Sequence, residues 1–149
     1  MCEFNVKLKF EWKPVLLSDG TEYMYPGTLT PCMKKRYRCP AVYRWNIYAE
    51  VAEDLKLAYI GETVCLCPGR IAGYLKPGPR QQTNTRINGI FKDFHKQGMK
   101  IRLEKVITDC SVDKFAFSET DLKDSCFRRT IEHLMVTMAK RNGFELLTV

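Results

Sequence analysis

The sequence predicts an α+β protein, in which a small antiparallel or mixed β-sheet is flanked by helices. Three observations carry this prediction: apolar residues alternate with polar ones in several short segments, two of these segments form a hairpin, and the helical patterns follow separately with one later strand. The chain has 149 residues, 45% of them hydrophobic, which suffices for one compact core. We therefore treat residues 1–149 as a single domain.

The predicted strands follow from alternation and from β-branched or aromatic residues. Residues 4–12 alternate strictly and are ended by Pro14, which predicts a half-buried strand. Residues 41–48 and 55–60 predict an antiparallel hairpin, with the acidic residues 50–54 as its turn. Residues 99–104 predict another strand and residues 144–149 a final one.

The segment up to Pro40 has turn residues and prolines, so we expect it to be irregular or weakly extended. Residues 1–40 then form an N-terminal strand with a basic extension, and residues 41–143 form the core of the domain.

Helical spacing predicts three helices. A short one follows Pro68 and Gly69 as far as Tyr74, and residues 76–84 are then expected to form a flexible basic loop. Thr83 or Asn84 is the expected cap of the second helix, which ends at Gly98 and buries Ile87, Ile90, Phe91 and Phe94. A capping-box pattern at residues 118–121 predicts the start of a long third helix that ends near residues 142–143.

Charge and cysteine usage narrow the class of partner and the compartment. The formal net charge is +7 and the pI is about 9.1, which favours a polyanion such as DNA. Residues 31–48 carry five basic side chains and no acid, and residues 69–105 carry nine against two acids. Seven scattered cysteines fit free thiols in a reducing, cytoplasmic compartment. The chain contains no apolar run long enough for a membrane span and no signal-peptide pattern, so we expect a soluble protein.

A set of polar residues falls on the strands and helices in an order that suggests chemistry. Ala41-Val42-Tyr43 lies on one hairpin strand and Tyr59-Ile60-Gly61 on the other. An arginine follows Gly61 by nine residues at the start of a helix, with a tyrosine one turn on, and a glutamate and an asparagine lie ten residues apart on the last helix. The constellation comprises Tyr43, Tyr59, Arg70, Tyr74, Glu132 and Asn142.

This arrangement resembles the GIY-YIG nuclease family, in particular its small phage and restriction-type members, over residues 41–143. The second motif is intact and the first keeps only its tyrosine. The sequence departs from the family at Ala41, which stands for a glycine, at Glu62, and in the 15 residues between the two tyrosines, where ten or eleven are usual.

The resemblance implies a divalent-metal-dependent endonuclease that hydrolyses phosphodiester bonds in DNA. It implies that Tyr43 is the general base for the attacking water and that Tyr59 orients that water or the phosphate. It also implies that Arg70 pairs with the scissile phosphate and that Glu132 binds the metal. A carboxylate with several waters is a ligand set that Mg²⁺ or Mn²⁺ accepts. An ordinary tyrosine, with a pKa near 10, needs a nearby cation to act as a base at neutral pH.

Each of these residues also has a structural interpretation, which the sequence leaves open. The tyrosines could be ordinary strand or packing residues, and Arg70 a solvated helix residue. Glu132 could form a helical ion pair with Arg128 or Arg129. Asn142 before Gly143 is also a normal helix end. A catalytically inactive nucleic-acid-binding module with the same fold is therefore the alternative function, and a small basic interaction protein is a third.

Two segments are expected to contact double-stranded DNA. The loop around residues 76–86 carries side chains able to reach base edges or phosphates, and the basic run before the hairpin fits a phosphate clamp. The candidates are Lys34, Lys35, Arg36, Arg38, Lys76, Arg80, Gln81, Gln82, Asn84 and Arg86. One active site cuts one strand at a time, so double-strand cleavage would require a homodimer or sequential nicking.

Overall fold

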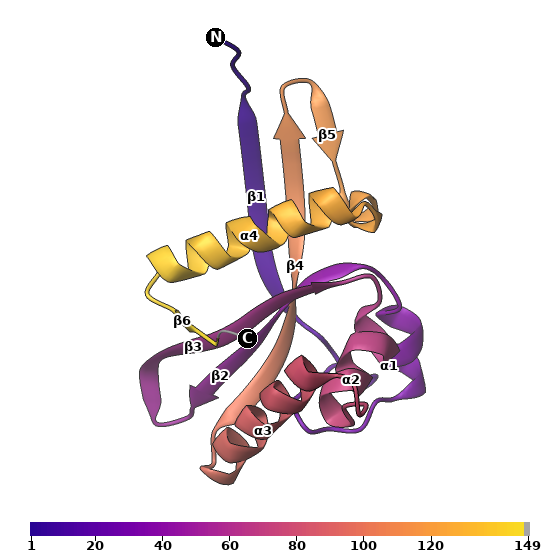
Figure 1. The fold of residues 1–149 in the computed structure, drawn as a ribbon, viewed down its shortest axis with the longest axis vertical. Helices are drawn as coiled ribbons and strands as arrows, with labels where there is room; N and C mark the ends of the chain where they lie inside the picture. The colour runs from indigo at the N-terminus through magenta and orange to yellow at the C-terminus, as the bar shows by residue number, and fades with distance from the viewer. Residues whose placement is uncertain (148–149) are drawn as a thin grey trace.

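The computed structural model describes residues 1–147, apart from the side chains of residues 52–54. Six strands, four α-helices and two shorter helical turns follow one another along this part of the chain (Figure 1). In order they are β1 (Val6–Pro14), α1 (Pro31–Arg36), β2 (Ala41–Ala49), β3 (Ala52–Thr63), the π-turn η1 (Leu66–Arg70), α2 (Ile71–Leu75), α3 (Gln82–Lys96), β4 (Lys100–Val112), β5 (Phe115–Phe117), the 3₁₀ turn η2 (Glu119–Lys123), α4 (Ser125–Arg141) and β6 (Glu145–Leu146).

The strands form one mixed sheet in the order β1-β4-β2-β3-β6, with β5 paired to the far end of β4. Only the β3–β6 pair is parallel among the described residues. The helices lie on its two faces: α4 crosses one face, and α2 and α3 pack on the other (Figure 1). The predicted α+β class is confirmed.

Alternation along β2 sends its side chains into two separate cores. Tyr43 and Trp45 point into the larger core, which contains Phe91 of α3. Val42 points to the opposite face, where it packs with Ile131 of α4. The period of two in the strand and the helical spacing in α3 and α4 thus match the faces they bury.

The hairpin turn is shorter than predicted. β2 ends at Ala49 and β3 begins at Ala52, so the turn is not the whole acidic stretch 50–54 but only Glu50 and Val51. A register shift between Ile47 and Ala49 accompanies it. Pairing with β2 also extends β3 beyond the predicted residues 55–60, because cross-strand contacts outweigh the weak strand propensity of acidic residues.

The segment before Pro40 is not irregular throughout, because α1 forms within it. Thr30 caps this helix by accepting a hydrogen bond from the Met33 amide at 3.2 Å, and Pro31 occupies its first position, where no intrahelical N–H is needed. Met33 is fully buried and fixes α1 to the core. One of the prolines that suggested an extended chain, Pro31, therefore starts a helix.

The two predicted helix starts are each displaced by a few residues. α3 begins at Gln82 and lacks a side-chain cap, so neither Thr83 nor Asn84 has the predicted role, and the loop before α3 is shorter than residues 76–84. The capping box at Ser118 exists, but it starts η2, whereas α4 is capped by Asp124, which accepts from the Phe127 amide at 2.8 Å. The predicted end of this helix is confirmed, with Gly143 at a φ of +84°.

The final strand is also shorter than predicted, since β6 covers only residues 145–146 and residues 148–149 lie outside the described part.

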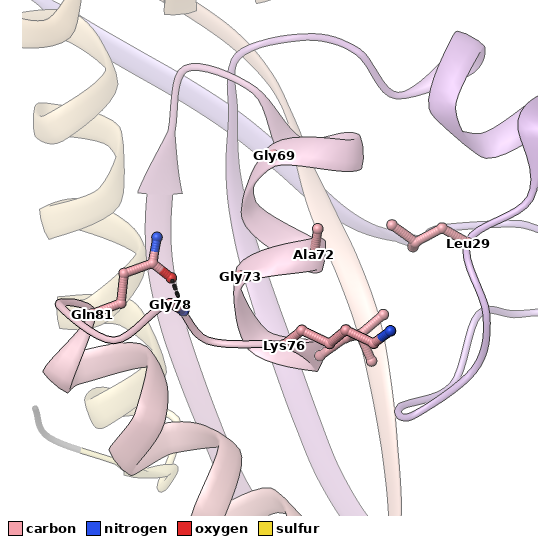
Figure 2. A pocket seen from close by; sticks show the side chains of 8 residues that line it. Leu29, Gly69, Ala72, Gly73, Lys76, Gly78 and Gln81 are labelled. Carbon is pink, nitrogen blue, oxygen red and sulfur yellow. Dashed lines mark hydrogen bonds between the residues drawn. The ribbon is translucent and has the colours of Figure 1, made fainter.

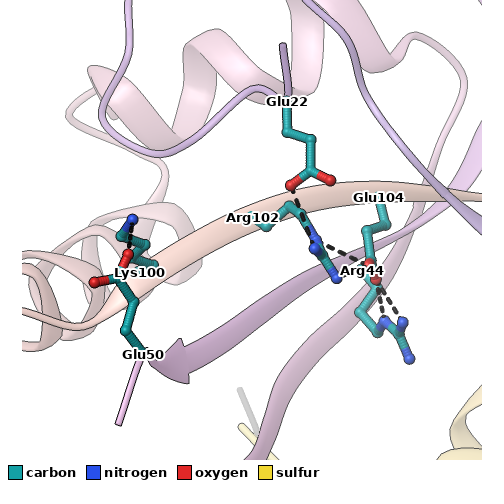
Figure 3. A network of polar contacts seen from close by, with 6 residues as sticks. All are labelled: Glu22, Arg44, Glu50, Lys100, Arg102 and Glu104. Carbon is teal, nitrogen blue, oxygen red and sulfur yellow. Dashed lines mark hydrogen bonds and ion pairs between the residues drawn. The ribbon is translucent and has the colours of Figure 1, made fainter. Parts of the chain in front are cut away.

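A buried carboxylate connects β2 and β4 (Figure 3). Glu104 is 3% exposed and accepts from the Arg44 Nε at 2.6 Å and from the Arg102 Nη2 at 2.7 Å, while Arg102 also reaches Glu22 at 3.3 Å. The Arg44 guanidinium in addition lies 4.5 Å from the centre of the Trp12 ring. Arg44 is therefore neutralised inside the fold and does not add to the exposed positive charge of residues 31–48.

Candidate functional site

Three tyrosines from three elements gather on the α2 side of the sheet. Tyr43 comes from β2, Tyr59 from β3 and Tyr74 from α2, and their ring centres lie 6.1–6.4 Å apart. The hydroxyls of Tyr43 and Tyr74 form a hydrogen bond of 2.6 Å. Tyr74, for which the sequence left packing and function open, thus directly contacts the tyrosine of the first motif.

The glycine of the second motif makes room for this cluster. Gly61 pairs with Tyr43 across the hairpin, and a Cβ on Gly61 would lie 2.6 Å from the Tyr43 hydroxyl. Residues directly opposite one another in an antiparallel pair share a face, so any larger residue would displace the Tyr43 ring. The register of the two motifs thus accounts for this glycine.

Burial controls the acidity of two of the tyrosines. Tyr43 and Tyr74 are each 1% exposed. Burial raises the pKa of the Tyr43 hydroxyl, and the neighbouring Tyr59 raises it further, whereas the hydrogen bond from Tyr74 and the positive charge of Arg70 lower it. Burial also raises the pKa of Tyr74 above its ordinary value. Both hydroxyls are therefore protonated at neutral pH in this structure.

Arg70 lies at the end of η1, immediately before α2, and is half-buried. Its charge acts on Tyr43, as the effect on that pKa shows. Within residues 1–147 its guanidinium takes part in none of the ion pairs. Arg70 is thus a cation beside the tyrosine cluster that pairs with no carboxylate among the described side chains.

Glu132 reaches the same region from α4, on the other face of the sheet. Burial raises the pKa of its carboxyl and the nearby Glu62 raises it further, while His133, Arg129 and Arg128 lower it. The charge of Glu132 in turn raises the pKa of Tyr43. In the described part of the chain, β6 pairs only with residues 57 and 58 of β3, so the edge of β3 at Gly61 has no further strand. The two faces of the sheet meet at this edge.

The helical ion pair considered for Glu132 is absent from the described contacts, because Arg128 pairs with a different carboxylate. The Arg128 Nε donates to Glu62, and its Nη1 donates to the Leu122 carbonyl at 2.8 Å. Arg128 is 7% exposed, and Arg129 lies 3.9 Å from Glu62. Glu62 is the residue near the site that the sequence did not single out as functional. Its only signal was that it directly follows the second motif.

Asn142 does not join the other candidates. It follows the last residue of α4, and its carbonyl accepts from the Lys56 Nζ at 3.0 Å. Ten helical residues correspond to about 15 Å along the axis, so Asn142 and Glu132 are separated by most of the second half of α4. Its described role is that of a helix end.

The donor set near Glu132 suits a hard divalent cation held mainly by water. Glu132 is a half-buried carboxylate with no ion-pair partner in the described chain, and the charge of Glu62 lies close to it. Among residues 1–147 no group of three or more His, Cys, Asp or Glu side chains is arranged to hold a metal. Mg²⁺ commonly keeps several waters and takes one or two carboxylates, so these residues fit Mg²⁺ or Mn²⁺.

The predicted DNA contacts fall on two neighbouring elements. The exposed cations Lys34, Lys35, Arg36 and Arg38 lie on α1 and directly after it. The chain after α1 hydrogen-bonds to η1, where the amides of Leu66 and Cys67 donate to Cys39 and Tyr37. This pairing brings the α1 cations beside the element that ends in Arg70. In addition, the sequence contains no acid between Glu62 and Asp93.

Within the second segment, five of the six candidate side chains are exposed and Asn84 is buried, while Gln81 and Asn84 are hydrogen-bonded to each other. Lys76, Arg80, Gln82 and Arg86 are exposed. The Gln81 side-chain oxygen accepts from the Gly78 amide at 3.2 Å (Figure 2). It also accepts from Asn84 at 3.0 Å, and Asn84 is 7% exposed. Gln81 and Asn84 therefore shape the loop, whereas the other four are available to a ligand.

A groove runs along α2 and the chain on either side of it, where it is lined by Gly69, Gly73 and Gly78 (Figure 2). It encloses about 520 Å³ between α2, Leu29 and the loop before α3, with Lys76 at its rim. A second cavity of about 260 Å³, lined by Arg70 among others, shares Gly69, Gly73 and Gln81 with it. The hollowed surface thus extends from Arg70 towards the basic loop.

Comparisons with known protein families, with curated proteins and with solved structures give no match.

All seven cysteines are free thiols. None of the helices within residues 1–147 has the length and apolar character that crossing a membrane requires.

Proposed function

We propose that this protein is a divalent-metal-dependent DNA endonuclease with a GIY-YIG-like fold. The observation that carries the proposal is the pairing of the tyrosines of the two motifs, Tyr43 and Tyr59, whose ring centres lie 6.4 Å apart. The charges of Arg70 and Glu132, which come from two other elements, both act on Tyr43. The β2–β3 hairpin, the helices α2 and α3, the strand β4 and the helix α4 follow one another in the order that the resemblance implies.

Each group has a distinct task in phosphodiester hydrolysis. Arg70, a cation beside the tyrosine cluster, binds the scissile phosphate and offsets the charge that develops on its oxygens. Glu132 would hold a Mg²⁺ or Mn²⁺ ion, which would supply positive charge next to the scissile phosphate and the attacking water. Tyr59, the half-buried member of the cluster, orients the attacking water.

Tyr43 is the general base of this proposal, and its surroundings define what it needs. Burial raises its pKa, so the phenolate forms only when positive charge near it outweighs burial. Arg70 supplies part of that charge, and the Tyr74 hydroxyl donates a hydrogen bond to the oxygen that becomes negative. Tyr74 is therefore a positioning residue for Tyr43.

One observation favours the alternative, an inactive nucleic-acid-binding module. Tyr43 is 1% exposed and its hydroxyl is satisfied by Tyr74, so a water reaches it only if the cluster opens. The exposed cations of α1 and of the loop before α3 would bind DNA in either case. The substrate in both proposals is double-stranded DNA, in a reducing cytoplasmic compartment consistent with seven free thiols.

A plasmid-nicking assay tests the proposal. Supercoiled DNA is incubated with the protein and Mg²⁺, and wild type is compared with Glu132→Gln and Tyr43→Phe. We expect nicking by wild type, abolished in both variants and in the presence of a chelator. Glu145→Gln, an exposed glutamate on β6, is the matched control and should cleave normally.

Binding of the same DNA is measured in parallel at several salt concentrations. Salt-dependent binding without cleavage by any of the proteins would reject the enzyme and favour the binding module. Absent or salt-insensitive binding would reject both functions.

A further inference from the structure

A cavity of about 470 Å³ lies between the end of α1 and the paired strands β1 and β4. It shares no lining residue with the tyrosine cluster or with the groove along α2. One wall is fixed in place, because the Tyr37 hydroxyl accepts from the Leu16 amide at 2.9 Å and so ties the end of α1 to the chain after β1. The volume lies in the range of cavities that bind small molecules.

Two lysines stand directly opposite one another in this cavity. Lys13 of β1 pairs with Lys105 of β4 in the antiparallel register, and both side chains line the cavity. Directly opposed residues share a face of the sheet, and like charges in such positions repel each other. The Lys105 side chain is only 19% exposed, so water screens its charge incompletely. Arg36 adds a third cation from the α1 side.

The nearby carboxylates do not neutralise these cations. Glu11 lies 3.9 Å from the Lys13 Nζ and is 70% exposed, and Glu119 lies 3.8 Å from the Lys105 Nζ and is 44% exposed. Ion pairs at this distance and exposure contribute little. Of the two carboxylates only Glu11 lines the cavity, against three cations. The cavity therefore carries a net positive charge that an anion would offset.

The remaining lining of the cavity is largely apolar. Ile107 follows Lys105 by two residues on β4 and therefore shares its face, and Leu16 and the 5% exposed Tyr37 also contribute. A small inorganic anion would leave this apolar surface uncovered, and a purely apolar ligand would leave the cations unpaired. The lining thus fits a ligand that has both a dianionic group and a flat apolar part.

We propose that this cavity binds a mononucleotide, with its phosphomonoester between Lys13, Lys105 and Arg36 and its base against the apolar wall. A phosphomonoester carries a charge of about −1.5 to −2 at neutral pH, more than the single charge of an internal phosphodiester. Its oxygens accept charge-assisted hydrogen bonds from ammonium and guanidinium groups.

Duplex DNA is not the expected occupant of the cavity. A duplex keeps its bases stacked inside and presents its phosphates on the outside, so it would meet exposed cations such as Lys34 and Lys35. The largely covered Lys105 is instead reached by a ligand that enters the cavity.

The same chemistry could come from a free nucleotide or from the phosphorylated end of a DNA strand. Lys105 also lies directly opposite Tyr43 in the β2–β4 register, so a strand end held here would be next to the tyrosine cluster. The binding proposal itself does not depend on nuclease activity.

Isothermal titration calorimetry with deoxyadenosine 5′-monophosphate, on the full chain and without divalent metal, tests the proposal. Wild type should bind this nucleotide more tightly than it binds deoxyadenosine or inorganic phosphate. Lys13→Gln and Lys105→Gln should each raise the dissociation constant about tenfold, as expected for the loss of one charge-assisted hydrogen bond. Lys9→Gln is the matched control, because Lys9 is an exposed lysine on the same face of β1 outside the cavity, and should leave the constant unchanged.

A competition experiment distinguishes the two sources of the phosphomonoester. A single-stranded oligonucleotide with a 5′-phosphate displaces the nucleotide if strand ends bind, whereas the same oligonucleotide with a 5′-hydroxyl does not. Displacement by neither form identifies the free nucleotide as the ligand. Equal displacement by both forms would contradict recognition of a phosphomonoester and would overturn the proposal.

Three further results would overturn it: no binding of the nucleotide by wild type, equally tight binding of inorganic phosphate, or lysine variants of the cavity that bind as tightly as Lys9→Gln. Circular dichroism checks that each variant is folded, and if Lys105→Gln fails to fold, Lys13→Gln alone decides the test. None of these measurements involves cleavage, so their failure would leave the proposed nuclease function untouched.

Discussion

The two faces of the β2–β3 hairpin satisfy their polar groups in different ways. On the α2 side, neutral hydroxyls of Tyr43 and Tyr74 bond each other within an aromatic core. On the α4 side, the buried guanidinium of Arg128 is paired with Glu62, and Glu132 is half-buried nearby. Neutral pairs can be buried deeply because they carry no net charge to desolvate, whereas carboxylates need a counter-charge or access to water. The difference explains why Tyr43 and Tyr74 are 1% exposed, whereas Glu62 and Glu132 on the α4 side keep some exposure.

The largest effect is expected when the positive charge of Arg70, beside the tyrosine cluster, is removed. Arg70→Ala should lower the rate of plasmid cleavage by about 10²–10³-fold, the usual cost of losing one charge-stabilising donor. Arg141→Ala, which removes an exposed arginine at the far end of α4, is the control. Equal rates for the two variants would show that the tyrosine face contributes no phosphate-binding charge.

The next effect concerns the stability of the α4 face. Glu62→Gln leaves Arg128 buried without its counter-charge and should lower the free energy of unfolding by about 2–3 kcal/mol, below the full cost for a buried pair because Glu62 retains some exposure. Glu50→Gln breaks the exposed pair with Lys100 and should leave the free energy of unfolding nearly unchanged, because solvent screens such a pair. Urea denaturation measures both. Similar losses in the two variants would mean that Arg128 tolerates water.

A methyl group tests the packing of the tyrosine face. Gly61→Ala brings a Cβ within 2.6 Å of the Tyr43 hydroxyl and should destabilise the protein by about 1–3 kcal/mol through displacement of that ring. Gly89→Ala has no atom within 4 Å on α3 and should be neutral or stabilising by up to about 1 kcal/mol. Thermal unfolding compares them. Unchanged stability in Gly61→Ala would contradict the position of Tyr43 over the glycine.

A smaller effect is expected on how stability depends on pH, through the half-buried carboxyl of Glu132 on the α4 side. Because the pKa of Glu132 is raised in the folded state, the folded protein binds more protons than the unfolded chain between the ordinary glutamate pKa and the raised value. The contribution of Glu132 to the free energy of unfolding therefore falls as pH rises through that window. Glu132→Gln should be more stable than wild type at pH 7, with the gain vanishing towards acid pH. A gain that is independent of pH would contradict the raised pKa of Glu132.

The smallest effect is expected at the end of α4. Asn142→Ala should leave cleavage unchanged and alter stability by no more than about 0.5 kcal/mol, because its described contact is made by the backbone carbonyl. Plasmid nicking and thermal unfolding measure the two quantities. A large loss of cleavage would place Asn142 in the site, as the family resemblance implies.

The fold was predictable where a local pattern coincides with the packed face. Alternation located β2 and the first residues of β4, and helical spacing located the buried face of α3. Boundaries failed where other contacts decide them. β3 extends as far as β2 offers hydrogen bonds, and α4 starts only after Asp124 because the adjacent η2 uses the capping box at Ser118.

By itself, the sequence determined the residue types and their order: Tyr43 and Gly61 on paired strands, Arg70 before a helix and Glu132 on the last one. The packing of distant segments decided which side chains are in contact. It placed the Tyr74 hydroxyl on Tyr43, gave Arg128 to Glu62 instead of Glu132, and left the outer edge of β1 open. The physical reason is that spacing along one element fixes only which face a side chain occupies. The partner on that face comes from a distant segment, and desolvation and hydrogen bonding in the packed interior select it.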